Sequence, residues 1–212
     1  MKRRLFSHLL AALFVGTIGW LAVPASAADE APDALIGRLT TEALNSIKAD
    51  KAVQSGDVAR VIALVDRLVM PNVDFKRMTA SAVGPKWRQA TPEQQQRLQE
   101  EFKILLVRTY AGALSQVNEV TFKIKPMRSD PAETEVVVRT EIKGRGDPIQ
   151  LDYRLEKTPG QGAGWKIYNL NVLGVWLVDT YRSQFAQEIN AKGIDGLITT
   201  LAERNQANAK KG

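Results

Sequence analysis

Apolar side chains recur at three- and four-residue spacing in the first half of the chain, which predicts amphipathic helices. The first helix begins at Pro32, because proline is favoured at the first helical position. A second helix follows Asp57 and ends at Pro71. A third is capped by Asp74 and ends at Gly84. The face that the first helix buries consists of Leu35, Ile36, Leu39, Ala43 and Ile47.

A capping box, Thr91-Pro92-Glu93-Gln94, begins a longer fourth helix. Its apolar face includes Leu98, Phe102, Leu105, Leu106 and Tyr110. Two more helices are expected near the end of the chain, over about 175–189 and 194–205, with Gly193 between them. The polar residues 206–212 are expected to form a flexible tail.

Between these helical regions the apolar period changes to strict alternation, which predicts four β-strands. Short, turn-rich links between them predict an antiparallel meander with one wet face and one apolar face. Helices before and after the sheet give an α+β domain in which the helices cover one sheet face. The alternating apolar residues are Val120, Phe122 and Ile124, then Val136, Val138 and Ile142, then Ile149, Leu151, Tyr153 and Leu155, and finally the segment from Trp165 to Val172.

The segment from Trp165 to Phe185 joins the predicted sheet to the helices that follow it. Its apolar phase changes between Ile167 and Leu170, which indicates a β-bulge near Tyr168-Asn169. The chain then turns at Gly174 and continues as a helix. A sheet that bends sharply and feeds a helix across its open end predicts a hollow cone.

Residues 1–27 have the pattern of a secretory signal peptide. A basic start at Lys2, Arg3 and Arg4 precedes an apolar run, and Ala25-Ser26-Ala27 is a small-residue cleavage site. The run is too short for a membrane anchor. Cleavage leaves residues 28–212, a chain of 185 residues, which is enough for one domain over about 28–205.

The charge balance and the rare residues exclude several classes of function. Three of the 29 basic residues lie in the predicted signal peptide, which leaves 26 against 23 acidic residues and no concentrated basic patch for nucleic acid. The chain has no Cys, and its one histidine, His8, also lies in the signal peptide. A mature chain without His and Cys lacks the commonest general base, the thiol nucleophile and most zinc ligands.

Carboxylates are the remaining candidates for catalysis. Strand alternation sends Asp152 to the wet face and Tyr153 inward, so the two do not converge on one substrate. Asp74 is better explained as a helix cap. The sequence therefore predicts no catalytic residue, no cofactor and no metal site. Composition and periodicity leave open whether helices fill the apolar sheet face completely or whether part of it lines a cavity.

A set of short motifs resembles the MlaC (toluene-tolerance, phospholipid-binding) family of periplasmic proteins over nearly all of the mature chain. Each motif is weak alone, and their order and spacing carry the resemblance. They are PNVDF at 71–75 with Met78, GPKWR at 84–88, ATPEQ at 90–94, Phe102 and Tyr110, WKIY at 165–168, Gly174-Val175, YRSQF at 181–185, and Gly193 with DGLI at 195–198.

The chain departs from the usual family pattern beside the proposed hollow. The family commonly has Tyr-Asp-Val followed by Glu-Gly-Val-Ser, whereas this chain has Tyr168-Asn169-Leu170 and Leu173-Gly174-Val175-Trp176. Two acids are lost and a large aromatic side chain is gained, which Trp176 would bring to the mouth of the hollow.

The resemblance implies a cone-like (NTF2-like) fold that holds phospholipid acyl chains in an apolar cavity, with the headgroup outside. It implies a periplasmic carrier in lipid transport and outer-membrane lipid asymmetry, with phospholipid as cargo rather than cofactor. It also implies two partners, an outer-membrane lipoprotein–porin complex and an inner-membrane ABC transporter with a ring of lipid-binding domains. The lipid-binding residues expected are Phe102, Leu106, Tyr110, Val136, Val138, Ile142, Leu151, Tyr153, Ile167, Leu170, Val172, Val175 and Trp176.

Two other functions remain open from the sequence. The first is a binder of another apolar small molecule, which would differ only in the size of the cavity. The second is an enzyme on the same cone-shaped fold, which would need polar groups that converge inside the hollow.

Overall fold

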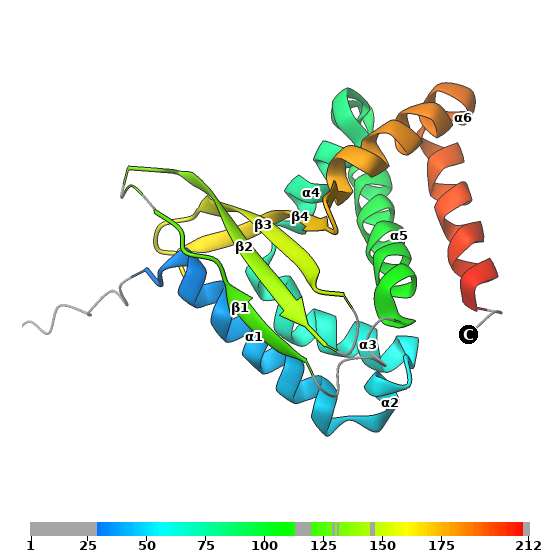
Figure 1. Cartoon of the computed structure of the whole chain (residues 1–212). Helices are drawn as coiled ribbons and strands as arrows, with labels where there is room; N and C mark the ends of the chain where they lie inside the picture. Colours follow the sequence, from blue (N-terminus) through cyan, green and yellow to red (C-terminus); the bar gives the residue numbers. More distant parts are fainter. Residues whose placement is uncertain (1–28, 113–119, 129, 131, 145–146, 210–212) are drawn as a thin grey trace, which may run out of the picture.

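The structure is a computed structural model that describes residues 29–112, 120–128, 130, 132–144 and 147–209. The predicted signal peptide lies outside these residues. The elements follow the predicted order of helices, sheet and helices (Figure 1). They are α1 (Pro32–Ala49), α2 (Lys51–Gln54), α3 (Val58–Leu64), the π-helix η1 (Val65–Val69), the 3₁₀-helices η2 (Met70–Asn72) and η3 (Gly84–Gln89), α4 (Phe75–Val83), α5 (Pro92–Tyr110), β1 (Thr121–Ile124), β2 (Glu135–Lys143), β3 (Ile149–Lys157), β4 (Trp165–Val172), β5 (Val175–Trp176) and α6 (Leu177–Ala209).

Three of the predicted helix starts are confirmed by their caps. The Asp57 carboxylate accepts a hydrogen bond from the backbone N–H of Arg60 at 3.1 Å, and Asp74 accepts one from the N–H of Arg77 at 2.8 Å. At the start of α5, the Thr91 hydroxyl accepts from the Gln94 N–H at 3.2 Å. The Gln94 side chain accepts in return from the Thr91 N–H at 3.0 Å. These bonds satisfy amide groups that a helix leaves unpaired at its first turn.

The sheet is an antiparallel meander in the order β1-β2-β3-β4-β5, so it has five strands where the sequence predicted four. The predicted bulge is present. Arg154 pairs with Asn169 and Leu155 with Ile167, which leaves Tyr168 as the extra residue on β4. After the bulge, Leu170 therefore returns to the apolar face that Ile167 occupies.

The fifth strand corrects the prediction that residue 175 begins a helix. Val175 pairs with Val172, and a two-residue turn at Leu173 and Gly174 connects them. Both turn residues have positive φ, 53° at Leu173 and 88° at Gly174, as a tight hairpin of this hand requires. Helix α6 therefore begins two residues later than predicted, at Leu177.

Gly193 divides α6 into two helical halves, as the sequence predicted. Its φ of 73° and ψ of −174° lie in a backbone region that is essentially restricted to glycine. The second half continues to Ala209 rather than ending near 205. The side chain of Asn205 is buried, and its amide donates to the backbone oxygen of Glu101 on α5 at 2.9 Å.

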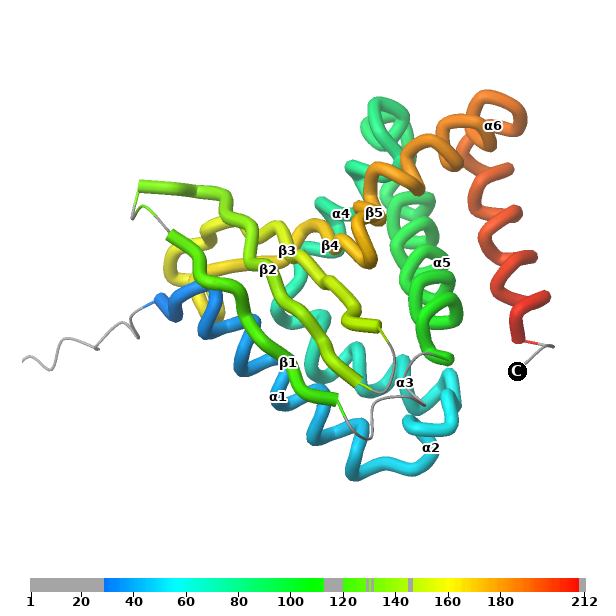
Figure 2. The backbone as a smooth tube through the Cα atoms, viewed as in Figure 1, coloured from blue at the N-terminus to red at the C-terminus, as the bar shows by residue number. Residues whose placement is uncertain are grey.

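The helices form two groups around the sheet. Helix α1 runs along the apolar face of the sheet, whereas α4, α5 and α6 stand together at one end of it (Figure 1, Figure 2). The edge of β4 is covered by the segment after η2, because Val73 bridges to Ile167 and the Asp74 N–H donates to the Ile167 oxygen at 2.9 Å. This segment holds η2 beside β4.

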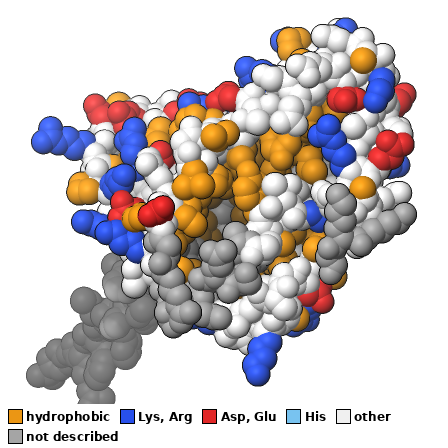
Figure 3. Space-filling model, turned by 45° about the vertical axis from the view of Figure 1, so that its right-hand side comes forward, with side chains coloured by type: hydrophobic (Ala, Val, Ile, Leu, Met, Phe, Trp, Pro, Cys, Tyr) orange, Lys and Arg blue, Asp and Glu red, His pale blue; other side chains and the backbone are white. Residues whose placement is uncertain are grey.

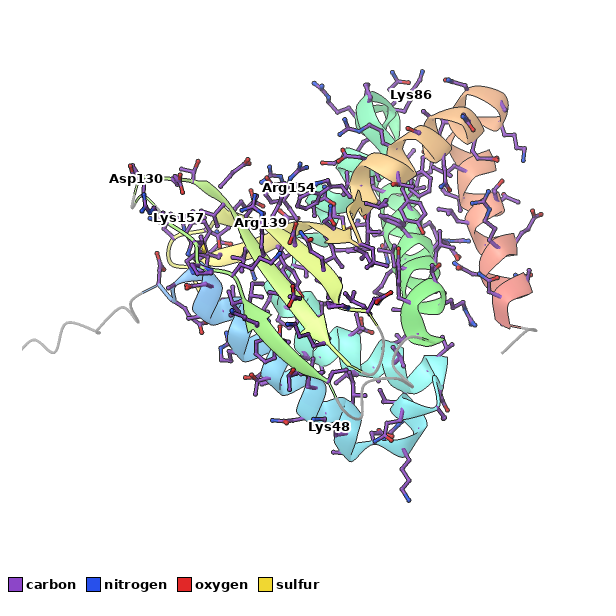
Figure 4. The ribbon with its side chains drawn as sticks, in the orientation of Figure 1. Lys48, Lys86, Asp130, Arg139, Arg154 and Lys157 are labelled. Carbon is purple, nitrogen blue, oxygen red and sulfur yellow. The ribbon has the colours of Figure 1, made fainter. Side chains whose placement is uncertain are left out.

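The opposite sheet face is polar, but it is not uniformly wet as the sequence predicted. Figure 4 shows Arg139 and Arg154, from neighbouring strands, on the face turned away from α1. Asp152 lies on this face, opposite in phase to Tyr153 as expected, yet it is only 7% exposed. The Gln150 amide donates to its carboxylate at 3.0 Å. Strand alternation therefore predicted the face on which Asp152 lies. The low exposure of Asp152 comes from the long side chains beside it on that face.

Candidate functional site

The apolar interior that the described residues form is divided into three separate clusters. The helical cluster, from α4, α5 and α6, is built around Phe102 and Phe185. The sheet cluster joins Leu35 and Ile36 of α1 to the inner face of β2, β3 and β4. The α1–α3 cluster contains Ile47, Val53 and Val61 with two residues from the end of α5. Close-packed domains usually have one continuous core, so the division indicates unfilled space between the clusters.

A cavity of about 330 Å³ occupies that space and contacts members of all three clusters. Its volume lies within the roughly 300–1,000 Å³ range of small-molecule sites. Figure 3 shows hydrophobic side chains gathered in a hollow on this side of the molecule. Apart from Lys103, every lining residue in the part of the chain that the structure describes is apolar or tyrosine: Ala43, Ile47, Val61, Leu64, Val65, Leu68, Val69, Met70, Val73, Phe75, Met78, Leu106, Val107, Tyr110, Ala111, Tyr153, Ile167, Leu170 and Leu177.

Helix α5 and the π-helix η1 form two facing walls of the cavity. On α5 the lining positions are Lys103, Leu106, Val107 and Tyr110, which share one helical face. In η1 three of the five residues, Val65, Leu68 and Val69, line the cavity. A π-turn is wider than an α-turn and is frequent at functional sites. In this protein the π-turn of η1 adds lining residues within the segment that the sequence predicted as the second helix.

Tyr153 forms the sheet wall. Its hydroxyl interacts with the side chains of Thr140 on β2 and Thr40 on α1. Burial, more than any other influence, raises the pKa of this hydroxyl. The neutral ring therefore presents an apolar wall that is fixed from two sides.

Five of the thirteen residues expected to bind lipid line the cavity: Leu106, Tyr110, Tyr153, Ile167 and Leu170. Phe102 lies behind the wall, fully buried against Phe75, Tyr181 and Phe185. Val136 and Val138 are buried in the sheet cluster under α1. The others that face inward lie beyond the lining, where Ile142, Leu151 and Val172 are half-buried and Val175 is 50% exposed.

Trp176 does not line the cavity. It pairs with Asn171, so it belongs to the polar sheet face, and the guanidinium of Arg154 stacks over its ring at 3.9 Å from the centroid. Asn169, another departure from the family pattern, fastens the start of α6. Its side-chain oxygen accepts from the N–H of Val178 at 3.2 Å. Both residues therefore hold the β4–β5–α6 connection from outside the hollow.

The residues of α1, α3 and η1 that line the cavity were not among those predicted from the sequence. A signal was present, because the segment after Asp57 is apolar on more than one face, with Val58, Val61, Ile62, Val65, Leu68 and Val69. A surface helix needs only one apolar stripe. The second apolar face of this segment serves the cavity.

Comparison with known proteins decides the family. The family model described as MlaC protein matches residues 37–203, which include every wall of the cavity. The chain belongs to the MlaC family. The toluene tolerance protein ttg2D of Pseudomonas putida is 30% identical to it over 187 residues, covering 85% of this chain and 86% of that protein.

Other matches carry MlaC or phospholipid-binding names. The intermembrane phospholipid transport system binding protein MlaC of Haemophilus influenzae is 22% identical over 83% of each chain. A phospholipid-binding protein from Ralstonia solanacearum, solved in complex with a phospholipid, has 45% identity and a TM-score of 0.79. That match covers 84% of this chain and 98% of the solved one. None of the helices in the described part of this MlaC-family chain has the length and hydropathy that crossing a bilayer requires.

Proposed function

We propose that this protein is a phospholipid carrier that holds acyl chains in the cavity between α1, η1, α5 and the sheet. The observation that carries the proposal is the lining, in which every described residue except Lys103 is apolar or tyrosine. The Ralstonia relative, solved with a phospholipid, supports the same ligand class. A cone-like (NTF2-like) arrangement is part of this proposal, since the bulged sheet and α1 enclose the hollow from two sides.

The energetics suit a passive carrier. Each methylene removed from water contributes about 0.8 kcal/mol, so exposing two long acyl chains would cost roughly 20 kcal/mol or more. The cavity needs only to match the free energy of a bilayer, because water is the unfavourable alternative for both. Exchange between the protein and an apolar acceptor therefore needs no energy source within this chain.

The same proposal gives the protein a place and partners. Export by residues 1–27 would deliver it to the periplasm. There it would carry lipid between an outer-membrane lipoprotein–porin complex and an inner-membrane ABC transporter with a lipid-binding ring. The Haemophilus relative, named for intermembrane phospholipid transport, supports this part.

A carrier is favoured over an enzyme by the polar groups that reach the cavity. Among the described residues these are the Lys103 ammonium, which donates to Asp66 at 2.7 Å, and the hydroxyls of Tyr110 and Tyr153. The Tyr153 hydroxyl interacts with the side chains of Thr140 and Thr40. No pair of these groups forms an acid and base placed around one substrate atom. A binder of another apolar molecule would use the same lining and is separated from a phospholipid carrier by identifying the cargo.

Native mass spectrometry tests the proposal. The full-length chain is exported in a bacterium, purified without detergent and measured under native conditions, and its lipids are then extracted and identified. We expect about one diacyl phospholipid per chain, held by apolar burial. Purified protein without lipid, or with a different apolar molecule at full occupancy, would refute the phospholipid carrier.

A further inference from the structure

Among the described residues that line the cavity, Lys103 is the one that carries a charge. Its ammonium donates to Asp66 Oδ1 at 2.7 Å, and the two side chains are 23% and 47% exposed. The lysine stem can lie along apolar surface while its charged end reaches water. The charge therefore marks the place where the apolar lining of the cavity meets solvent.

The pair joins the two facing walls. Lys103 shares its helical face with Leu106, Val107 and Tyr110 on α5. Asp66 lies in η1, between lining residues of the π-turn. A lipid whose acyl chains lie between these walls would have its phosphate near the edge of the lining, where a cation is within reach of it.

The chemistry of the pair permits an exchange of anions. A lysine ammonium has three donors, and the described residues give this one a single hydrogen-bond acceptor, Asp66. A phosphate diester carries one negative charge, as a carboxylate does, so it can replace Asp66 as the anion paired with the ammonium, while the Asp66 carboxylate, 47% exposed, remains in contact with water. Partly exposed ion pairs contribute little free energy, so the displacement of Asp66 costs little.

We propose that Lys103 binds the phosphate of the carried lipid and that Asp66 holds the ammonium in place while the cavity is empty. This inference rests on the proposed function and adds a headgroup site to it. The ligand class is a phosphate diester joined to acyl chains. The site favours a phospholipid over a diacylglycerol with the same chains, which fills the cavity equally well and has no anion for Lys103.

If Lys103 and Asp66 formed only a structural salt bridge, their substitution would have different effects on lipid binding from those that a phosphate site predicts. If the pair served only to tie α5 to η1, removing either partner would have effects in the same direction. In a phosphate site the two residues act in opposite directions, because Lys103 attracts the phosphate and Asp66 competes with it. Lys103→Met keeps most of the stem and removes the charge, whereas Asp66→Asn releases the lysine.

The experiment presents the mature chain with vesicles containing equal amounts of phosphatidylglycerol and diacylglycerol with identical acyl chains. The ratio of the two lipids on the recovered protein is measured by mass spectrometry. We expect wild type to prefer phosphatidylglycerol and Lys103→Met to lower that preference about tenfold, the effect of losing one charge-assisted hydrogen bond. Asp66→Asn should raise the preference, and Lys103→Arg should keep it.

Two controls sharpen the result. Arg67→Gln removes a neighbouring cation in η1 that lines a separate polar hollow with Asp50 and Arg60, and it should leave the ratio unchanged. An excess of inorganic phosphate should also leave the ratio unchanged, because a free anion lacks acyl chains. If the preference for phosphatidylglycerol were lost in its presence, the site would bind free phosphate, and the headgroup assignment would be wrong. An unaltered ratio in Lys103→Met, or shifts in the same direction for Lys103→Met and Asp66→Asn, would also overturn it. Wild type that takes up neither lipid would instead refute the carrier function itself.

Discussion

Phe102 and Leu106 lie one turn apart on α5 and were both expected to contact lipid, but the structure separates their roles. Phe102 is fully buried, with ring centroids 4.9 Å from Tyr181 and 5.2 Å from Phe185. Leu106 is half-buried and faces the cavity. Truncating each residue to alanine should therefore give two different results, one in stability and one in lipid exchange.

The magnitudes follow from what each side chain contacts. Phe102→Ala removes a ring from a close-packed aromatic group, which costs about 3–5 kcal/mol in a core. That corresponds to a decrease in Tm of about 6–20 °C for a domain of this size. Leu106→Ala removes three carbons at about 0.8 kcal/mol each when fully buried. Because this side chain already borders empty space, we expect a loss of only about 1 kcal/mol.

The assay is urea unfolding of lipid-free protein, combined with the rate of lipid transfer to acceptor vesicles. Lipid must be removed first, because a ligand that binds only the folded state raises the apparent stability. At a temperature where both variants are folded, Phe102→Ala should transfer lipid at the wild-type rate. Leu106→Ala should transfer it several times faster, because it loses contact with the acyl chain.

Two results would contradict this reasoning. A Leu106→Ala variant that loses as much stability as Phe102→Ala without lipid would mean that protein side chains fill the space we describe as a cavity. A folded Phe102→Ala variant with no lipid would return Phe102 to the ligand-binding wall.

Three further predictions concern stability, each measured by urea unfolding of lipid-free protein. Leu173→Asn should raise the free energy of unfolding by about 1 kcal/mol, because Leu173 is 63% exposed at φ 53°, a conformation that asparagine tolerates better; no gain would argue against the strained turn. Gly193→Ala should lower it by about 1–3 kcal/mol through backbone strain alone, since a Cβ there meets no atom within 4 Å; an unchanged value would refute the kink. Hydrogen bonding to Arg77 lowers the pKa of Glu135, so Glu135→Gln should be less stable than wild type at pH 7 by under about 1 kcal/mol. This difference in stability should disappear as the pH falls through the lowered pKa, because Glu135 then becomes protonated. A difference that persists at pH 3 would mean that packing, and not charge, causes it.

The sequence by itself determined the longer helices, the first four strands and several helix starts. Caps at Asp57, Asp74 and Thr91 are local interactions, since each side chain accepts a hydrogen bond from the amide three residues along the chain. The bulge at Tyr168 and the break at Gly193 were predictable for the same reason, because strand phase and glycine conformation are properties of short segments. The fifth strand was missed because two residues are too few to show a period.

The tertiary structure alone decided which apolar residues pack together and which face empty space. Phe102 and Leu106 have the same helical periodicity, yet one contacts three aromatic rings and the other a cavity. Trp176 lies outside the hollow because β5 pairs with Asn171 and turns its ring toward Arg154. A hydrophobic pattern in the sequence indicates which side chains are shielded from water. Whether another side chain or a ligand covers it depends on how far apart the walls stand, and that distance is set by contacts between segments remote in sequence.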